Sequence, residues 1–273
     1  MKVAFFIKKD ELRGDSRIAE LLSQLRQAGV EVYEIRCRNC VQQGTDLLLS
    51  FGGDGTFLSA AHRVADAGIP ILGVNLGRLG FLSSHRIEDV AAHLTSGNYS
   101  VKERTMLQVS VHGAEIEDFW PYAVNEAGLH RSDAGTLGVD VSIDGVRLPA
   151  YWADGLIVAT SIGSTAYSLS AGGPICLPAS SVLLLTPVAP HNLNLRPVVL
   201  PASSCISLTA RSRSGQALLS VDNRDYTLPE GVEVEIRQAP FKLKKVCLEG
   251  DNFIDALKDR LFWGKDVRNS NEG

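Results

Sequence analysis

A glycine-rich turn between an apolar strand and a helix is the feature that most constrains this chain. Residues 47–51 form an apolar run, which leads directly into Gly52, Gly53, Asp54, Gly55 and Thr56, where a helical pattern begins. Glycine adopts backbone angles closed to other residues and lets a ligand approach the main chain. The free N–H groups and the positive dipole end of the following helix suit a phosphate. The sequence therefore predicts a strand–turn–helix unit that binds an anion.

Asp54 stands in the middle of this predicted anion site. A carboxylate does not bind phosphate directly, so its position indicates a base for a hydroxyl group or a ligand for Mg²⁺. Both roles belong to phosphoryl transfer, which is the first activity that the sequence predicts.

The composition narrows the class of protein. The chain has 273 residues, of which 45% are hydrophobic and 21% charged, with a formal net charge of -4. A pI near 5.9 argues against a general nucleic-acid binder. No apolar run approaches the roughly 20 residues that a membrane span needs, and the N-terminus does not have the pattern of a signal peptide. We therefore expect a cytoplasmic protein with neither a nucleic acid nor a membrane as partner.

The five cysteines do not form a disulfide framework, because their number is odd and their spacing is scattered. Cys37 and Cys40 form an isolated C-x-x-C pair, and no second Cys or His pair stands at the spacing of a zinc site. We expect free, reduced thiols at all five positions, with redox use of the pair as the alternative.

Strand and helix patterns alternate over the first 100 residues. Apolar runs at residues 3–7, 30–35, 47–51 and 69–74 predict strands, with helices between them and a further helix at 88–94. This order predicts an α/β domain over residues 1–100 with a mostly parallel sheet. Ligands of such sheets bind beyond the carboxyl ends of the strands, where the turn at 52–55 and the loop at 77–80 both lie.

The pattern changes after Val101. Alternating apolar residues and short strand-like runs, the last at 241–248, predict a β-rich, sandwich-like domain over residues 101–250. Residues 251–273 return to a helical pattern, capped by Asp251 or Asn252 and closed by Gly264. Its apolar stripe consists of Phe253, Ile254, Leu257 and Leu261. We expect this helix to pack on the N-terminal domain, so that its deletion would unfold that domain.

Three further segments carry candidate chemistry. Residues 153–174 are dense in small residues and hydroxyls, which is consistent either with a pocket for a flat ligand beside Tyr167 or with a well-packed turn. Asn125 and Glu126 follow a strand-like run and could hold a ribose diol. Asp222 and Asn223 close another such run and could be no more than a turn.

The sequence contains neither G-x-x-x-x-G-K-[ST] nor G-x-G-x-x-G, and no lysine occurs between Lys9 and Lys102. A phosphate at the glycine turn would therefore depend on backbone amides, on Mg²⁺ and on Arg63 or Arg78.

Four motifs together resemble the bacterial NAD kinases in order and spacing. They are the turn at 52–56, the loop at 76–82, the pair Asn125 and Glu126, and the segment from Asp154 to Pro174. Residues 253–264 resemble the terminal helix of that family. The glycine-aspartate turn alone is shared with phosphofructokinases and lipid kinases, but its combination with the segment at 163–174 is specific.

The resemblance implies a Rossmann-like N-terminal domain, a β-rich C-terminal domain that carries much of the NAD site, and a homodimer or homotetramer. It also implies transfer of the γ-phosphate of ATP, with Mg²⁺, to the 2′-hydroxyl of the adenosine ribose of NAD. Asp54 is then the base, and Gly52, Gly53, Gly55 and Thr56 form the turn for the phosphate donor. The implied NAD-binding residues are Asp54, Gly55, Asn125, Glu126, Asp154, Thr165, Ala166, Tyr167, Ser168, Leu169, Ser170, Ala189 and Asn223.

The chain departs from the family pattern at two positions. Ile162 replaces a common threonine, and Trp152 stands where relatives often carry a basic residue. Two other functions also remain open, namely a lipid or sugar kinase that shares only the turn and a catalytically silent NAD-binding sensor. Retention of Asp54 argues against the sensor, because pure binding would favour a neutral residue beside phosphate.

Overall fold

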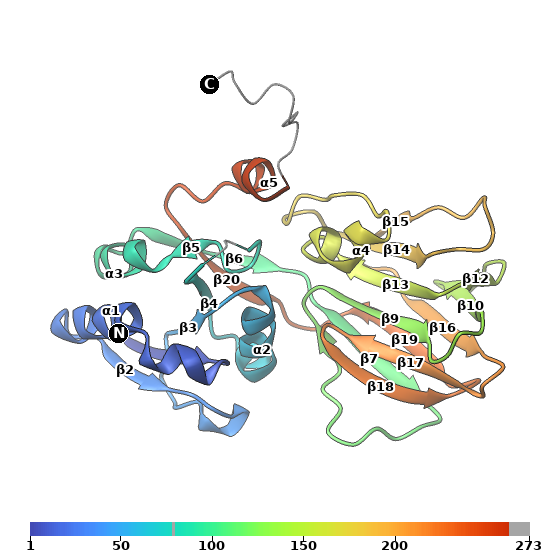
Figure 1. Ribbon diagram of the computed structural model, residues 1–273, viewed down its shortest axis with the longest axis horizontal. Coiled ribbons are helices and arrows are strands. Elements are labelled where there is room, and N and C mark those ends of the chain that lie inside the picture. The colour runs from blue at the N-terminus through green and yellow to red at the C-terminus, as the bar shows by residue number, and fades with distance from the viewer. Residues whose placement is uncertain (78–79, 262–273) are drawn as a thin grey trace. The chain divides into compact units, whose positions relative to one another are not determined.

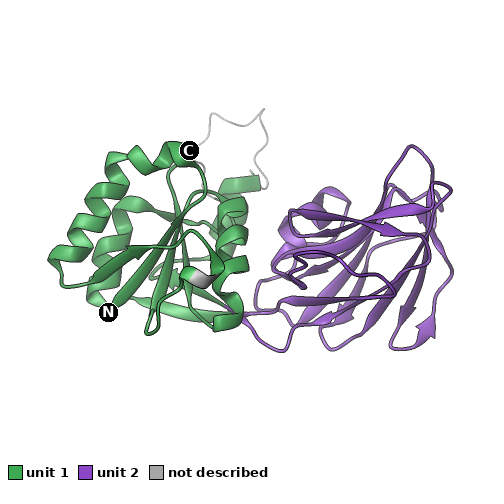
Figure 2. Cartoon of the chain, turned by 90° about the horizontal axis from the view of Figure 1, so that it is seen from below, with its two compact units in different colours: residues 1–103, 244–273 green, residues 104–243 purple. Residues whose placement is uncertain are grey.

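The computed structural model describes residues 1–77 and 80–261 and divides the chain into two compact units (Figure 2). The first unit combines Met1–Glu103 with Lys244–Gly273, and the second is Arg104–Leu243. Arg78, Leu79 and Gly264, all named in the sequence analysis, lie outside the described residues.

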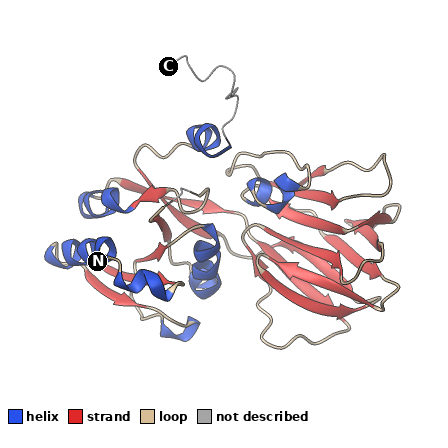
Figure 3. Cartoon of the chain, viewed as in Figure 1, coloured by secondary structure: helices blue, strands red, loops and turns tan. Residues whose placement is uncertain are grey.

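The first unit is built on one sheet, with the strand order β2-β1-β3-β4-β20-β6 and β5 beside β4 (Figures 1 and 3). Its strands are β1 (Lys2–Ile7), β2 (Glu31–Glu34), β3 (Leu47–Phe51), β4 (Ile71–Asn75), β5 (His85–Arg86), β6 (Tyr99–Arg104) and β20 (Leu243–Leu248). Strand β1 pairs in parallel with both β2 and β3, and β3 with β4. The predicted parallel α/β architecture is therefore confirmed.

The α-helices described in this unit are α1 (Ser16–Gln27), α2 (Asp54–Val64), α3 (Ile87–Ser96) and α5 (Phe253–Leu261). Short 3₁₀ helices lie at Asp10–Gly14, Arg38–Cys40 and Ala65–Ala67. Helix α1 buries Ile18, Leu21, Leu22 and Leu25, the spacing of one helical face, in a core shared with α3 and the sheet. Helix α2 packs on β3 and β4, which fixes the direction in which its first turn points.

Strand β20 corrects the sequence analysis, which placed the run at 241–248 in the β-rich domain. Leu243–Leu248 instead enters the first sheet between β4 and β6, with Lys245 opposite Ile71 in parallel register. Leu243 and Val246 are completely buried. An apolar run of this kind is typical of any buried strand, and the sequence pattern does not identify the sheet that it joins.

The second unit consists of two antiparallel sheets, as the sequence predicts for a sandwich. One sheet has the order β11-β10-β16-β19-β7-β8 with β12 beside β10, and the other has the order β15-β14-β13-β9-β17-β18. The strands of the first are β7 (Leu107–His112), β8 (Tyr122–Ala123), β10 (Leu137–Ile143), β11 (Val146–Arg147), β12 (Tyr151–Ala153), β16 (Ile206–Arg211) and β19 (Glu233–Gln238). Those of the second are β9 (Glu126–Arg131), β13 (Gly155–Thr160), β14 (Val182–Val188), β15 (Val198–Pro201), β17 (Gln216–Val221) and β18 (Arg224–Pro229).

Alternate residues of both sheets of the second unit face a common core. Leu156 and Val158 of β13 meet Leu208 of β16 and Ile236 of β19 in this cluster. A 3₁₀ helix at Gly163–Thr165 and the short helix α4 (Tyr167–Ser170) follow β13. Among residues 1–77 and 80–261, no helix is both long and apolar enough to cross a membrane.

The apolar stripe that the sequence predicts for helix α5 is only partly packed. The Asn252 side chain accepts a hydrogen bond from the Ile254 N–H at 2.9 Å, which confirms the predicted cap. The Phe253 ring lies 6.0 Å from the Phe81 ring, so the helix contacts the first unit. Ile254 is 46% exposed and does not belong to the packed face. No side chain of α5 is fully buried, so the helix contributes less to the core than the sequence indicates.

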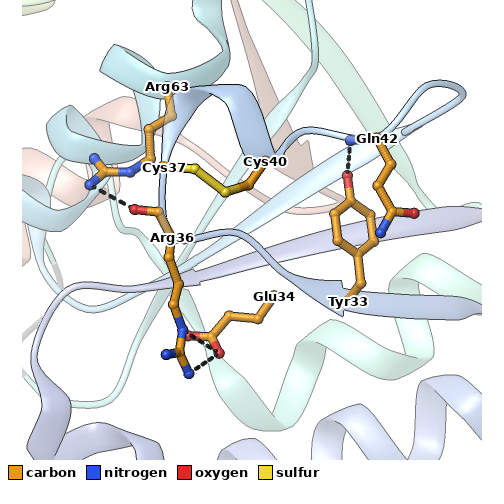
Figure 4. The surroundings of a disulfide bond; sticks show 7 residues. All are labelled: Tyr33, Glu34, Arg36, Cys37, Cys40, Gln42 and Arg63. Carbon is orange, nitrogen blue, oxygen red and sulfur yellow. Dashed lines mark hydrogen bonds and ion pairs between the residues drawn. A yellow bond between two sulfur atoms is a disulfide. The ribbon is translucent and has the colours of Figure 1, made fainter.

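Cys37 and Cys40 correct a second expectation, because they form a disulfide rather than two free thiols (Figure 4). The 3₁₀ turn at Arg38–Cys40 brings their Cα atoms to 5.3 Å, within the range that a disulfide spans. Arg63 of α2 donates to the Arg36 carbonyl beside this turn. The thiols of Cys176, Cys205 and Cys247 do not belong to a disulfide, as expected.

We predict that two C-terminal truncations differ sharply in stability. A chain that ends after Glu249 loses α5 and should unfold with a free energy lower by roughly 2–4 kcal/mol, since only partly buried side chains are lost. A chain that ends after Gln238 also loses β20, a buried strand between β4 and β6, and should not unfold cooperatively. Urea denaturation followed by circular dichroism measures both. Equal losses in the two chains would contradict this division.

Candidate functional site

The glycine turn of the first unit has the geometry that the sequence predicts. Gly53 is the N-cap of the 11-residue helix α2, and no side chain caps the helix there. Gly52 has φ +144°, and a Cβ at this position would lie 2.5 Å from Thr56 Oγ1, so only glycine fits. The exposed residues Gly53 and Gly55 thus present the first amides of α2 to solvent, which is a typical site for an anion.

Asp54 connects this turn to the loop that follows β4. Its carboxylate accepts hydrogen bonds from the N–H groups of Phe81 at 2.9 Å, Leu82 at 3.0 Å and Ser83 at 2.8 Å. Oδ1 accepts two of these bonds and Oδ2 only one. Since each carboxylate oxygen offers about two acceptor positions, Oδ2 retains one for a further donor. A Cβ at Gly80 would overlap this carboxylate, which explains the glycine there.

The cations near the turn differ from those expected. Arg63 lies in the last turn of α2, where its guanidinium stacks 4.2 Å from the Phe6 ring centroid and donates to the Ser59 carbonyl. It is therefore about two and a half helical turns from Asp54, and its contacts direct it to Phe6 and Ser59 rather than to the glycine turn. Lys245 of β20 instead reaches the loop after β4, donating to the Phe81 carbonyl at 3.3 Å and to Ser84 Oγ at 3.4 Å.

Arg260 of α5 also reaches this loop, with its guanidinium 4.9 Å from the Phe81 ring centroid. The sequence analysis missed both Lys245 and Arg260. Lys245 is 164 residues from Phe81 along the chain, and no local spacing relates either cation to the glycine turn.

In the second unit, Asp222 organises the segment that contains Asn125 and Glu126. Its carboxylate accepts from the N–H groups of Val124 at 2.9 Å, Asn125 at 2.8 Å and Glu126 at 3.3 Å. Asp222 has φ +52° in the turn between β17 and β18, a conformation that aspartate tolerates better than most residues. The sequence analysis treated Asp222 as a possible turn residue, and an acid placed 96–98 residues away gives no local signal of this role.

Glu126 combines burial with an open hydrogen-bonding position. The residue is 9% exposed, and its Oε2 atom is buried without a hydrogen-bond partner. Burial raises the pKa of Glu126 to about 8, with a further contribution from the charge of Asp222, whereas a backbone hydrogen bond from Tyr167 lowers it. At neutral pH the side chain is therefore largely a neutral acid, which both donates and accepts hydrogen bonds.

Four of the predicted site residues line one cavity of about 560 Å³ in the second unit, namely Glu126, Asp154, Tyr167 and Asn223. This volume is within the usual range for a small-molecule site. The cavity is also lined by residues that the sequence analysis missed: His130, Arg131, Val188, Leu218, Ser220, Asp222 and Asp225. Arg131 pairs with Asp154 at 3.2 Å, and His130 stacks on Tyr167 with ring centroids 5.6 Å apart. Burial lowers the pKa of His130, which favours the neutral ring.

The hydroxyl-rich segment forms a well-packed turn, and its Tyr167 also lines the cavity. Thr160 Oγ1 donates to the Val124 carbonyl at 2.7 Å and accepts from the Gly163 N–H at 3.1 Å, which ties the segment to Asn125. Ser164 and Ser168 are completely buried, and Ser168 hydrogen-bonds to Thr186 at 2.9 Å. These hydroxyls hold the turn together, so the Ser168 side chain is directed into the interior. Tyr167 is 42% exposed and lies on the cavity.

The remaining predicted NAD-binding residues are not among those that line this cavity. Thr165 and Ala166 are partly buried beside α4, Leu169 is partly buried within it, and Ser170 is exposed. Ala189 is exposed just after β14, with φ +45°. Ile162 is buried and so replaces the family's threonine with a core side chain.

Trp152 is 41% exposed and lines a different hollow of about 710 Å³, together with His191 and Arg213. Within residues 1–77 and 80–261, no group of three or more His, Cys, Asp or Glu side chains is placed to hold a metal ion.

Comparisons with known proteins match both units. The sequence profile of the ATP-NAD kinase N-terminal domain matches residues 3–99, and that of the ATP-NAD kinase C-terminal domain matches residues 124–248. An NAD kinase of Bacteroides fragilis is 44% identical over 227 residues, 82% of this chain and 78% of that protein. An NAD kinase of Porphyromonas gingivalis is 36% identical over 289 residues, 98% of this chain and 99% of that protein.

Two solved structures have the same fold. Yeast NADH kinase complexed with NADH superimposes with a TM-score of 0.86 at 27% identity, over 98% of this chain and 90% of that one. An NAD kinase from Archaeoglobus fulgidus in complex with ATP gives a TM-score of 0.78 at 26% identity, over 96% and 99%. A kinase that shares only the glycine turn would not match over both units. The chain therefore belongs to the ATP-NAD kinase family and is an NAD kinase.

Proposed function

We propose that the chain transfers the γ-phosphate of ATP to the 2′-hydroxyl of the adenosine ribose of NAD, with Asp54 as the general base. The observation that carries this proposal is the position of Asp54 in the first turn of α2, with one acceptor position of Oδ2 still open. A carboxylate held in this way has an acceptor for a hydroxyl proton next to amides that suit phosphate.

The first unit supplies the groups for the donor. The first amides of α2 and the positive end of its dipole face the phosphates, and Gly53 and Gly55 leave the main chain accessible. Mg²⁺ would be held mainly by the phosphates of ATP and by water, which leaves the open position of Asp54 Oδ2 to the hydroxyl. When bound, the ion neutralises charge that develops on the transferred phosphoryl group.

The second unit supplies the groups for the dinucleotide. Glu126 Oε2 and the Asn125 amide are the candidates for a ribose diol, and Tyr167 offers a ring face to a base. Positioning of this kind is the main catalytic contribution to phosphoryl transfer, because the protein has little covalent chemistry to perform. By analogy with the family we further propose a homodimer or homotetramer that acts in the cytoplasm.

The test is formation of NADP from NAD and Mg·ATP, together with an analogue that lacks only the adenosine 2′-hydroxyl. The analogue should bind and compete with NAD but receive no phosphate, since it has no acceptor oxygen at Asp54. Phosphorus NMR of the product identifies the modified hydroxyl. Phosphate on another hydroxyl would overturn the assignment of Asp54, and binding without any turnover would support the silent sensor instead.

Asp54→Asn should lower turnover about 10²- to 10⁴-fold while NAD binding is retained, because the amide has nearly the same shape but cannot accept the proton. Steady-state kinetics and calorimetric titration with NAD separate these two effects. Asp66→Asn is the matched control, since Asp66 is a surface aspartate paired with Arg38. Turnover by Asp54→Asn above about a third of the wild-type value would rule out this role.

Glu126 should make stability depend on pH. Its pKa rises in the folded state from 4.5 to about 8, so the folded protein holds this proton more tightly than the unfolded chain. The resulting stabilisation is complete below pH 4.5 and is lost as the pH rises through about 8. Glu126→Gln should remove this part of the pH dependence, as measured by urea unfolding at several pH values.

Asp222→Asn provides the comparison for this experiment. It removes the charge that also raises the pKa of Glu126, so the loss of stability should move to lower pH. His130, Arg131, Asp154 and Asp225 line the same cavity and remain unchanged in both variants. Parallel stability curves for the wild type and Glu126→Gln would refute the assignment.

A further inference from the structure

Arg260 lies next to the loop that binds the Asp54 carboxylate. Its guanidinium is 4.9 Å from the centroid of the Phe81 ring, and the Phe81 N–H donates to Asp54 Oδ2 at 2.9 Å. A second aromatic contact, between Phe253 and Phe81 with ring centroids 6.0 Å apart, holds the first turn of α5 on the same loop. The C-terminal helix therefore brings a positive charge to the end of the first sheet where the glycine turn lies.

The Arg260 charge has no ion-pair partner within residues 1–77 and 80–261. Among the residues that the structure describes, none places a carboxylate oxygen within 4.0 Å of the Arg260 guanidinium. The negative charges of Asp54, Asp251 and Asp259 nevertheless act on it and raise its pKa, while partial burial, the larger effect, lowers it. A partly buried guanidinium costs free energy unless an anion accompanies it, and its planar donors suit a phosphate in particular.

The other cations described around the loop are already engaged. Lys245 Nζ donates to the Phe81 carbonyl and to Ser84 Oγ, and Arg63 lies at the far end of α2 over the Phe6 ring. Among the described residues of the loop, Arg260 contacts the face of the Phe81 ring, and this contact leaves its N–H groups available. The glycine turn contains no lysine, so a cation from elsewhere in the chain would add to the charge that Mg²⁺ and the amides of α2 supply to a donor phosphate.

We propose that Arg260 binds the phosphates of the ATP donor at the glycine turn. The C-terminal helix thus performs the role that a lysine within the turn performs in P-loop enzymes. This inference rests on the proposed phosphoryl transfer. It extends that proposal, because it assigns to α5 a part in donor binding in addition to its contribution to stability.

The test compares Arg260→Gln and Arg260→Lys with the wild type. Arg260→Gln should raise the KM for ATP about 10- to 100-fold, as expected for a lost charge-assisted phosphate contact, and change the KM for NAD less than about twofold. Arg260→Lys should recover part of the loss, since it retains the charge without the planar fork. The melting temperature of each variant, with and without Mg·ADP, reports folding and donor binding separately.

Lys258→Ala is the matched control. Lys258 carries the same charge on the same helix, but it is 61% exposed and pairs with Asp255 within α5, so its loss should leave both KM values unchanged. An unchanged KM for ATP in Arg260→Gln, or equal increases for ATP and NAD, would overturn the role of Arg260. If the wild type formed no NADP, phosphoryl transfer itself would be wrong, and the two failures are therefore distinguishable.

Discussion

The hydrogen bonds between the Asp54 carboxylate and three consecutive amides are the interaction on which the first unit's site depends. Strands β3 and β4 are neighbours in a parallel sheet, so the segments that follow them leave the sheet at the same edge. Asp54 belongs to the first segment, and Phe81, Leu82 and Ser83 belong to the second. A single side chain thus fixes both segments and at the same time keeps its own oxygens in a defined orientation. Gly80 is required by the same contact, because any side chain there would occupy the space of the carboxylate.

The second unit also has a carboxylate that accepts hydrogen bonds from consecutive amides, but the acid beside it has a different protonation state. Asp222 also accepts from three consecutive amides, those of Val124, Asn125 and Glu126. Here the carboxylate lies beside a second acid, and both are removed from solvent, so the pKa of Glu126 rises to about 8. Asp54 is left with an acceptor for a proton, whereas Glu126 holds its own proton at neutral pH and can donate a hydrogen bond. Two acids held near main-chain amides therefore contribute complementary chemistry.

The sequence predicted those features that depend on local patterns. The strand at Leu47–Phe51 and the helix after the glycine turn each follow from the spacing of apolar residues and from turn chemistry. The family motifs located Glu126, Asp154, Tyr167 and Asn223, which the structure brings to one cavity. Features that depend on distant segments were missed, because local patterns do not specify pairing between them. These include the sheet joined by β20, the role of Asp222 and the cations Lys245 and Arg260. The Cys37–Cys40 disulfide is a local feature, but the C-x-x-C spacing alone does not distinguish a disulfide from two free thiols.

Strand β20 and helix α5 return the chain to the first unit, where both contact the loop that binds Asp54. Strand β20 pairs with β4, the strand that leads into the loop bound by Asp54. Lys245 on this strand donates to the Phe81 carbonyl, so the strand that completes the sheet also fixes the peptide whose N–H binds Asp54. The chain then continues into α5, whose Phe253 and Arg260 both contact the Phe81 ring. Phe81 is therefore contacted at its carbonyl, its amide and its ring by three separate elements. Because the final strand is part of the sheet core, the position of the following helix is set by the fold, and a cation far away in sequence can serve a glycine turn that lacks its own.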